Sequence, residues 1–329
     1  MGVLEGIRQR AAKLQKTIVL PEGFEPRIIE AAAIATESKV SKVILLGNPE
    51  QIRSNSKGVD LSGVEIIDYL NSDKMDLYAK ELFELRKHKG ITIEDAGKML
   101  KDPLYYAVMM VKMGDADGMV AGSINSTADV LRPALQIIKT APGIRVVSSV
   151  FFIELPTDEY GHKGTLIFGD CGVNPDPNAE ELAAIAVSTA RTAKQVALME
   201  PVVALLSYST KGSAVHPRVD KVIEATKLAK QMAPEFMIDG ELQGDAALVE
   251  KVGRLKCPDS QVAGMANVLV FPDLDSGNIA YKLTQYLAGA QAVGPICQGF
   301  AKPINDLSRG CSPLDVMNAI AITAVQAEI

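Results

Sequence analysis

Short apolar runs alternate along the chain with longer segments whose apolar residues recur every three or four positions. The runs are rich in Val, Ile and Leu, which favour strands, whereas the longer segments have the spacing of one helix face. Strands separated by helices imply right-handed crossovers and a mainly parallel sheet. The pattern therefore predicts an α/β fold with strands near residues 17–21, 42–46, 64–68, 118–121, 145–153, 165–168, 202–207, 237–242, 268–270 and 292–296.

The predicted helices lie mostly between these strands and share apolar residues at helical spacing. One of them follows the loop 122–129 and contains Arg132. The stretch 156–164 has the composition of a turn and predicts a hairpin of two antiparallel strands. The other helices are expected at residues 2–14, 26–36, 74–89, 92–100, 103–113, 178–198, 218–232, 244–255, 276–288 and 312–327.

The chain length suits one large or two medium α/β domains. A single core stops growing beyond about 250 residues, and this chain has 329. The pattern breaks at Thr140-Ala-Pro-Gly143, and a sheet of mixed strand direction begins near Ile144. We expect a first α/β domain of residues 1–143 and 298–329, to which the last helix returns, and a second domain of residues 144–297.

Composition restricts the classes of partner. The net charge is −6, and Lys and Arg are spread along the chain, which argues against a nucleic-acid surface but not against a local phosphate pocket. The four cysteines are far apart and suggest reduced thiols rather than disulfides or a metal site. There is no apolar stretch of membrane-spanning length and no signal-peptide core. We expect a cytoplasmic protein without a membrane or nucleic-acid partner.

The common nucleotide and zinc signatures are missing from the sequence. The chain has three histidines, and none follows a pattern for a Ser or Cys nucleophile, so a histidine-based triad is not predicted. Chemistry must then come from Ser, Arg, Lys, Asp and backbone dipoles. These groups gather in four loops that follow predicted strands, where parallel sheets carry their sites.

The loop 122–129 supports two interpretations that do not exclude each other. Ser126 and Asp129 have the spacing of a helix capping box. The same helix start, with hydroxyl groups and Arg132 nearby, also suits an anion. The loops 207–213 and 271–278 are weaker candidates: both have the composition of a phosphate cradle and equally of a solvent-exposed loop.

The loop 302–315 is the most informative. Arg309 stands between Ser308 and Gly310, in a loop that prolines stiffen, and its planar fork suits phosphate or a carbonyl oxyanion. Asp315 lies three residues after Ser312, which predicts a capped helix start. A carboxylate there would be a weak base, yet still able to accept a proton from a thiol. Cys311 is a possible nucleophile, although unpaired cysteines are more often inert.

Five segments, in order, resemble the phosphate acetyltransferase (phosphotransacetylase) family, part of the phosphate acetyl/butyryltransferase group. Each is weak alone, but their order is specific, and the resemblance runs from about Thr17 to the C-terminus. The segments are Ser126-Thr-Ala-Asp-x-x-Arg-Pro-Ala134, Ser207-Tyr-Ser-Thr-Lys-Gly-Ser-Ala214, Asp239-Gly-Glu-Leu-Gln243, Phe271-Pro-x-Leu-x-x-Gly-Asn-Ile-x-Tyr-Lys282 and Asn305-Asp-Leu-Ser-Arg-Gly310.

The resemblance implies two α/β domains with an active-site cleft between them, an architecture like that of isocitrate and isopropylmalate dehydrogenases, and a homodimer. It implies reversible acetyl transfer between acetyl phosphate and coenzyme A by direct thiolate attack in a ternary complex. Coenzyme A is then a substrate, and no cofactor or metal is expected.

The resemblance also implies roles for individual residues. Asp315 would take the proton from the thiol of coenzyme A, Arg309 would hold the phosphate and the carbonyl oxygen, and Ser308 would orient the thiol. The residues implied for substrate binding are Arg86 and Arg132, at coenzyme A or phosphate groups, and Ser126, Thr127, Tyr281, Lys282 and Asn305, in the acyl phosphate pocket.

Two departures and three alternatives remain open. Gly122-Ser-Ile-Asn125 replaces the family's usual Gly-Ala-Ala-His, and Gly244 replaces a bulkier residue. Transfer of butyryl or another short acyl group depends on a pocket depth that sequence does not reveal. A metal-dependent dehydrogenase would need an Asp cluster and a nicotinamide loop, which the sequence lacks. The third alternative is a non-catalytic module that binds acyl-CoA. The presence of Ser308, Arg309 and Asp315 argues against it.

Overall fold

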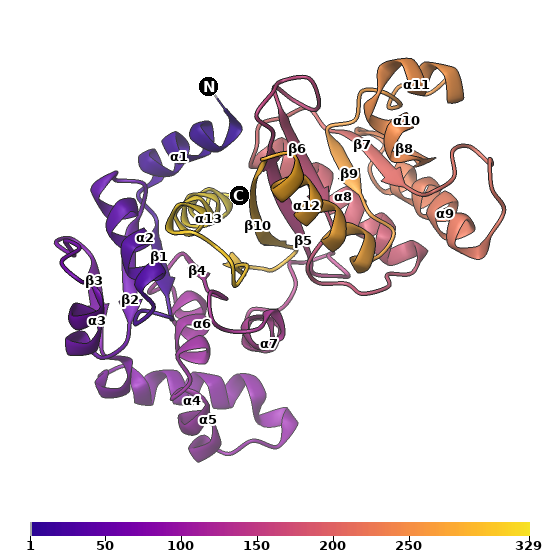
Figure 1. Cartoon of the computed structure of the whole chain (residues 1–329). Helices are drawn as coiled ribbons and strands as arrows, with labels where there is room; N and C mark the ends of the chain where they lie inside the picture. The colour runs from indigo at the N-terminus through magenta and orange to yellow at the C-terminus, as the bar shows by residue number, and fades with distance from the viewer. Residues whose placement is uncertain (1) are drawn as a thin grey trace. The chain divides into compact units, whose positions relative to one another are not determined.

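The structure is a computed structural model that describes residues 2–329. The chain forms two compact units (Figure 1), which we call the terminal unit, residues 7–142 and 300–329, and the middle unit, residues 2–6 and 143–299. The first residues therefore belong to the middle unit, whereas we predicted them in the other domain. A hydrogen bond from the Leu4 backbone N–H to Glu154 Oε1 at 3.0 Å joins these residues to the middle unit.

The terminal unit contains a five-stranded sheet in the order β11-β4-β1-β2-β3. All neighbouring strands in it are parallel, as the alternation of strands and helices predicted. The strands are β1 (Thr17–Leu20), β2 (Lys42–Leu46), β3 (Glu65–Ile67), β4 (Gly118–Val120) and β11 (Ile304–Asn305).

Helices cover both faces of this sheet, which explains why its strands are apolar runs rather than alternating ones. α2 (Pro26–Glu37) and α13 (Pro313–Gln326) pack together, and α13 contacts β1 and β4. α6 (Pro103–Met113) contacts the same strands and also α7 (Thr127–Ile137). The remaining helices are α3 (Pro49–Asn55), α4 (Met75–Arg86) and α5 (Ile93–Met99), with 3-10 turns at Tyr69–Asn71 and Lys87–Lys89. α1 (Val3–Leu14) begins in the middle unit and continues into the terminal unit from residue 7.

The middle unit contains a six-stranded sheet in the order β10-β5-β6-β9-β7-β8. β5 runs antiparallel to both of its neighbours, so the hairpin predicted at 156–164 is confirmed. The other pairs are parallel. The strands are β5 (Ser148–Glu154), β6 (Thr165–Gly169), β7 (Val202–Leu206), β8 (Met237–Leu242), β9 (Val268–Val270) and β10 (Gln291–Gln298).

The helices of the middle unit lie near the predicted positions, with one exception. α8 (Ala179–Gln195) and α9 (Pro217–Met232) pack on parallel strands, and α12 (Leu274–Leu287) contacts β10, β5 and β6. The single helix predicted at 244–255 is wrong, because the structure has α10 (Gly244–Leu248) and α11 (Glu250–Lys256). Val249 has extended backbone angles between them, which a β-branched residue adopts readily.

Two further elements were not predicted. α3 follows β2 directly, and its first turn is capped by Asn48. β11 lies inside the segment that we interpreted as a loop, and two residues are too few to show a strand pattern. Its pairing is made by the backbone: Met119 N–H donates to Pro303 O, and Ala121 N–H donates to Asn305 O, both at 3.1 Å. Within residues 2–329, no helix combines the length and the apolar character needed to cross a membrane.

Candidate active site

Most of the predicted site residues follow β4 and β11, and the loop after the neighbouring strand β1 contacts both of these segments. From β1 the chain continues to β2 and β3 on one side of the sheet, whereas β4 and β11 lie on the other side. Parallel sheets place ligand sites where strand order reverses in this way. Each loop also leads into a helix, α2, α7 or α13, so three helix N-termini with positive partial charge lie at this edge.

Glu22 organises the loop after β4. Its carboxylate is 2% exposed and accepts hydrogen bonds from Ser123 N–H at 2.8 Å, Ser123 Oγ at 2.6 Å and Asn125 Nδ2 at 2.7 Å. The backbone N–H groups of Gly122, Ile124 and Asn125 donate to it at 3.1–3.2 Å. The anion that this loop binds is therefore an internal carboxylate, and the amides of residues 122–125 are not free for a substrate.

Arg27 joins the loops after β4 and β11. Its Nη1 donates to Arg309 O at 2.8 Å and Cys311 O at 3.2 Å, and its Nη2 donates to Ser123 O at 3.1 Å. Glu25 Oε1 accepts from Arg27 Nε at 2.6 Å and orients the guanidinium. Sequence reasoning missed both Arg27 and Glu22. The available signal was a carboxylate and an arginine in the segment directly after the first strand.

Ser308 and Arg309 form a tight turn. Cys311 N–H donates to Ser308 O at 2.9 Å, and Gly310 N–H donates to Ser308 Oγ at 3.4 Å. The Arg309 side chain is exposed and makes no hydrogen bond or ion pair with another described residue. The backbone carbonyl of Arg309 is held by Arg27, so the exposed guanidinium extends from a fixed backbone position.

Asp315 occupies the third position of α13 and forms the predicted capping box with Ser312. Its Oδ2 accepts from Ser312 N–H at 2.9 Å and from Ser312 Oγ at 2.7 Å. Its Oδ1 makes no hydrogen bond to any residue in the described chain. One carboxylate oxygen is thus used by the helix, and the other is available to accept a proton.

Asn305, Asp306 and Thr127 lie inward of the turn. Asn305 is fully buried, and its Nδ2 donates to Thr323 Oγ1 and Gln326 Oε1 of α13, both at 2.7 Å. Thr127 Oγ1 donates to Asp306 Oδ2 at 2.6 Å. Burial raises the pKa of Asp306 to about 7. Asn305 therefore anchors α13, while Asp306 contacts the start of α7.

Ser126 caps α7, accepting from Asp129 N–H at 3.2 Å. Farther along this helix, Arg132 Nη2 lies 3.1 Å from Asp129 Oδ1. Arg86, at the end of α4, has a buried Nε without a hydrogen-bond partner. Burial raises the pKa of Tyr105, and the charges of Arg132 and Arg86 oppose this shift. The two arginines therefore lie near the same phenol, on helices that contact each other.

Tyr281 and Lys282 lie in the middle unit, on α12. Tyr281 is 5% exposed and stacks on Phe151, with ring centroids 3.9 Å apart. Lys282 Nζ lies 5.0 Å above the Tyr281 ring. The Tyr281 ring is thus part of the core of its unit. The loops after β7 and β9, which we had considered as phosphate cradles, line a cavity of about 350 Å³ in this unit.

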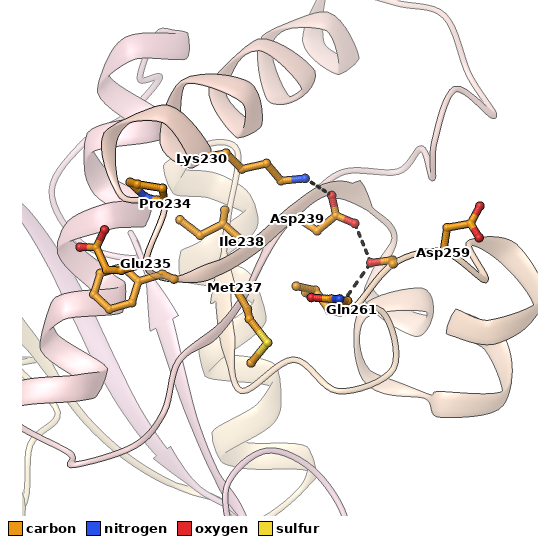
Figure 2. A pocket seen from close by; sticks show the side chains of 11 residues that line it. Lys230, Pro234, Glu235, Met237, Ile238, Asp239, Asp259 and Gln261 are labelled. Carbon is orange, nitrogen blue, oxygen red and sulfur yellow. Dashed lines mark hydrogen bonds and ion pairs between the residues drawn. The ribbon is translucent and has the colours of Figure 1, made fainter.

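A second cavity of the middle unit, about 500 Å³, lies beside Asp239 (Figure 2). Lys230 and Lys211 donate to Asp239 Oδ1 at 2.8 and 2.7 Å, and Ser260 donates to Oδ2 at 2.6 Å. Burial alone would raise the pKa of Asp239, but these donors lower it to about 2. The carboxylate is neutralised by its own neighbours, which indicates a structural network.

Cys311 is unsuited to nucleophilic attack. The thiol is buried, and burial raises its pKa to about 11 although Arg27 opposes the shift. A nucleophilic cysteine needs a lowered pKa and access to solvent. Across residues 2–329, no group of His, Cys, Asp or Glu side chains has the arrangement of a metal site.

Residues 2–324 match the family described as phosphate acetyl/butaryl transferase. The chain therefore belongs to this family, in agreement with the five sequence segments. It is 56% identical over 328 residues to the phosphate acetyltransferase of Thermoanaerobacterium thermosaccharolyticum, covering 100% of both chains. It is also 56% identical to the phosphate acetyltransferase of Acetivibrio thermocellus, covering 100% of this chain and 99% of that protein.

Solved structures agree with this assignment. A phosphotransacetylase from Streptococcus pyogenes is 47% identical, with a TM-score of 0.91 over 99% of this chain and 98% of that one. A 4-hydroxythreonine-4-phosphate dehydrogenase from Klebsiella pneumoniae is 12% identical, with a TM-score of 0.54 over 95% and 98% of the two chains. The second likeness concerns the fold alone and confirms the predicted dehydrogenase-like architecture.

Proposed function

We propose that this chain transfers an acetyl group reversibly between acetyl phosphate and coenzyme A. Relatives that are 56% identical over the whole chain are phosphate acetyltransferases. The observation that carries the proposal is the site at the edge of the terminal sheet: Arg309, exposed on a turn fixed by Arg27, and Asp315, with one free oxygen at a helix N-terminus. This arrangement suits a phosphorylated substrate and a thiol.

In the proposed reaction, Asp315 Oδ1 accepts the proton of the coenzyme A thiol. The thiolate sulfur forms a bond to the carbonyl carbon of acetyl phosphate, and the bond from that carbon to the phosphate oxygen breaks. The electron pair leaves with phosphate, which needs no protonation to depart. Arg309 stabilises the charge on the carbonyl oxygen and the phosphate as it develops, and Ser308 orients the thiol. Alignment of two bound substrates supplies much of the acceleration.

For substrate binding we propose that Arg86 and Arg132 hold phosphate groups of coenzyme A. The charges of both arginines act on Tyr105, so the two side chains present positive charge to the same region, as a phosphate-bearing ligand requires. Ser126 and Thr127, at the start of α7, are proposed for the acyl phosphate pocket. Lys282, on α12 of the middle unit, is proposed separately as a substrate-binding residue. Asn305 and Tyr281 are buried, so we propose that each supports the structure of its own unit rather than contacts the substrate.

We further propose a homodimer in the cytoplasm that needs no cofactor. One face of α12 supports self-association: Ile279, Leu283, Tyr286 and Leu287 are 57%, 52%, 76% and 80% exposed at helical spacing. Exposed apolar surface of this kind marks interaction sites. No disulfide joins the cysteines within residues 2–329, which fits a reducing compartment.

The test is formation of a thioester from acetyl phosphate and coenzyme A by the purified full chain, with butyryl phosphate in parallel. Rapid turnover with acetyl phosphate and little with butyryl phosphate supports the proposal, and the reverse preference assigns the chain to butyryl transfer. Binding of acetyl-CoA without turnover would identify a regulatory module instead. Arg309→Gln is expected to abolish most activity, whereas Arg145→Gln, at a surface ion pair with Glu180, serves as the matched control.

A further inference from the structure

Asp306 is a buried carboxyl group for which the proposed reaction has no role. It follows β11 directly and is 0% exposed. Its Oδ2 accepts from Thr127 Oγ1 at 2.6 Å, while its Oδ1 is buried without a hydrogen-bond partner. An ionised carboxylate with an unsatisfied buried oxygen is costly, so the geometry favours a neutral, protonated group.

The carboxyl group also touches the loop after β4. Gly122 has a φ of +113°, and a Cβ at this position would come within 2.1 Å of Asp306 Oδ1 and 2.7 Å of Leu307 N. The absence of a side chain at Gly122 is therefore what lets the two loops meet. Asp306 connects the turn that carries Ser308 and Arg309 with both this loop and the first turn of α7.

We propose that Asp306, in its protonated form, is a positioning residue that holds the Ser308–Arg309 turn against Gly122 and the start of α7. The proposal rests on the function proposed above. In this proposal Asp306 contacts neither the reacting atoms nor the substrate. It acts by positioning Arg309.

The groups around Asp306 set its pKa and therefore the pH at which it loses its proton. The hydrogen bonds of Thr127 and of the Leu307 backbone lower the pKa of Asp306. The charge of Glu22, in the loop after β1, raises it, and that of Arg309, on the same loop as Asp306, lowers it. The start of α7 contributes the uncharged Thr127. Arg27 and Asp315 act on the neighbouring Cys311. Burial is the largest cause and places the pKa of Asp306 at about 7.

Loss of the proton would have two consequences at this site. It would place a second buried anion near Glu22 and so weaken the contact between the loops. It would also attract the guanidinium of Arg309 inward, away from a substrate anion. Activity should therefore fall as the pH rises through the pKa of Asp306.

The decisive variant is Asp306→Asn, which keeps the size of the side chain and an acceptor for Thr127 but cannot ionise. At pH 6 we expect kcat/KM within about threefold of wild type, since small displacements of a positioning group have graded effects. Between pH 6.5 and 8.5 the wild type should show a falling limb that Asp306→Asn lacks. Asp306→Ala, which removes the Thr127 bond, should lower kcat about tenfold at pH 6 and, like Asp306→Asn, should lack the falling limb. Asp60→Asn, at an exposed turn, is the matched control.

Three outcomes would overturn the proposal: an unchanged alkaline limb in Asp306→Asn, wild-type kcat in Asp306→Ala, or a loss of activity in Asp306→Asn as large as that in Arg309→Gln. A carbon-13 titration of the carboxyl groups in the full chain tests the protonated form independently of catalysis. A resonance titrating near neutral pH and missing in Asp306→Asn is expected. If the wild type is inactive with either acyl phosphate, the proposed function fails, while this titration still decides whether Asp306 is neutral.

Discussion

Arg27 Nη1 donates a hydrogen bond of 2.8 Å to the backbone carbonyl of Arg309, across 282 positions of the sequence. The same guanidinium reaches Ser123 O and Cys311 O. One side chain from the first loop therefore joins the local turn at Ser308 in fixing the place of the proposed catalytic arginine.

We predict that Arg27→Gln lowers kcat for acetyl-CoA formation by about tenfold to a hundredfold, because small displacements of a catalytic group have effects of this size. Circular dichroism should show an intact fold. Arg27→Lys should recover little, because an ammonium group cannot reproduce the planar fork. Activity within twofold of wild type in Arg27→Gln would show that Arg309 is positioned without it.

Asp315→Asn distinguishes the helix-capping role of Asp315 from its proposed role as the general base. Asparagine still accepts hydrogen bonds from Ser312, so the start of α13 should persist and the thermal midpoint should change little. We expect kcat to fall about a hundredfold or more, as for loss of a general base. Partial recovery at alkaline pH is expected because the thiol then ionises by itself. Near wild-type turnover at every pH would assign Asp315 to capping alone.

Cys311 should react slowly with alkylating reagents. With a pKa of about 11, the thiol is almost wholly protonated at pH 8, and it is buried as well. Labelling of this residue by iodoacetamide, followed by mass spectrometry of the peptides, should be about a hundredfold slower in the native chain than in urea. Cys311→Ala should keep turnover within about threefold. Fast labelling accompanied by loss of activity would contradict this.

Asp306 should make stability depend on pH in a defined direction. Its pKa is raised from 3.8 to about 7 in the folded chain, so the native state binds more protons than the unfolded state between these values. The free energy of unfolding should therefore decrease from about pH 4 to pH 7, by roughly 4 kcal/mol at most, and then level off.

Urea midpoints of wild type and Asp306→Asn at pH 5 and pH 8 test this directly. The urea midpoint of Asp306→Asn should rise relative to that of the wild type as the pH increases, because the variant has no ionisable group at position 306. Asp60→Asn, at an exposed carboxylate whose pKa is lowered by its hydrogen bonds to Ser62, should show no such gain. An equal difference at both pH values would mean that Asp306 ionises normally.

Arg86→Gln and Arg132→Gln should raise KM for coenzyme A about tenfold each and leave KM for acetyl phosphate nearly unchanged, since each removes a charge-assisted phosphate contact. The experiment is a steady-state measurement with each substrate varied in turn. Equal effects on both KM values would instead place the arginines at the acyl phosphate. Because both lie near Tyr105, their effects should not be additive.

The sequence determined the local structure and the family. Strand and helix segments follow from apolar spacing, which acts over a few residues. Helix starts follow from caps such as Asn178 and Ser312, whose hydrogen bonds span three positions. Ordered motifs identified the family and singled out Ser308, Arg309 and Asp315. These features are legible because each is encoded within one short segment.

The tertiary structure decided what depends on contacts between distant segments. β11 exists because β4 offers backbone partners, and its two residues carry no pattern of their own. Glu22 binds a loop 100 or more positions away, and Asn305 is directed toward α13. The ring of Tyr281, a pocket candidate in the sequence, packs in a core. Asp306 is buried because three strands bring their loops to one edge of the sheet, and its proposed positioning role depends on that burial. The order of strands in a sheet is not encoded in any single segment of the sequence.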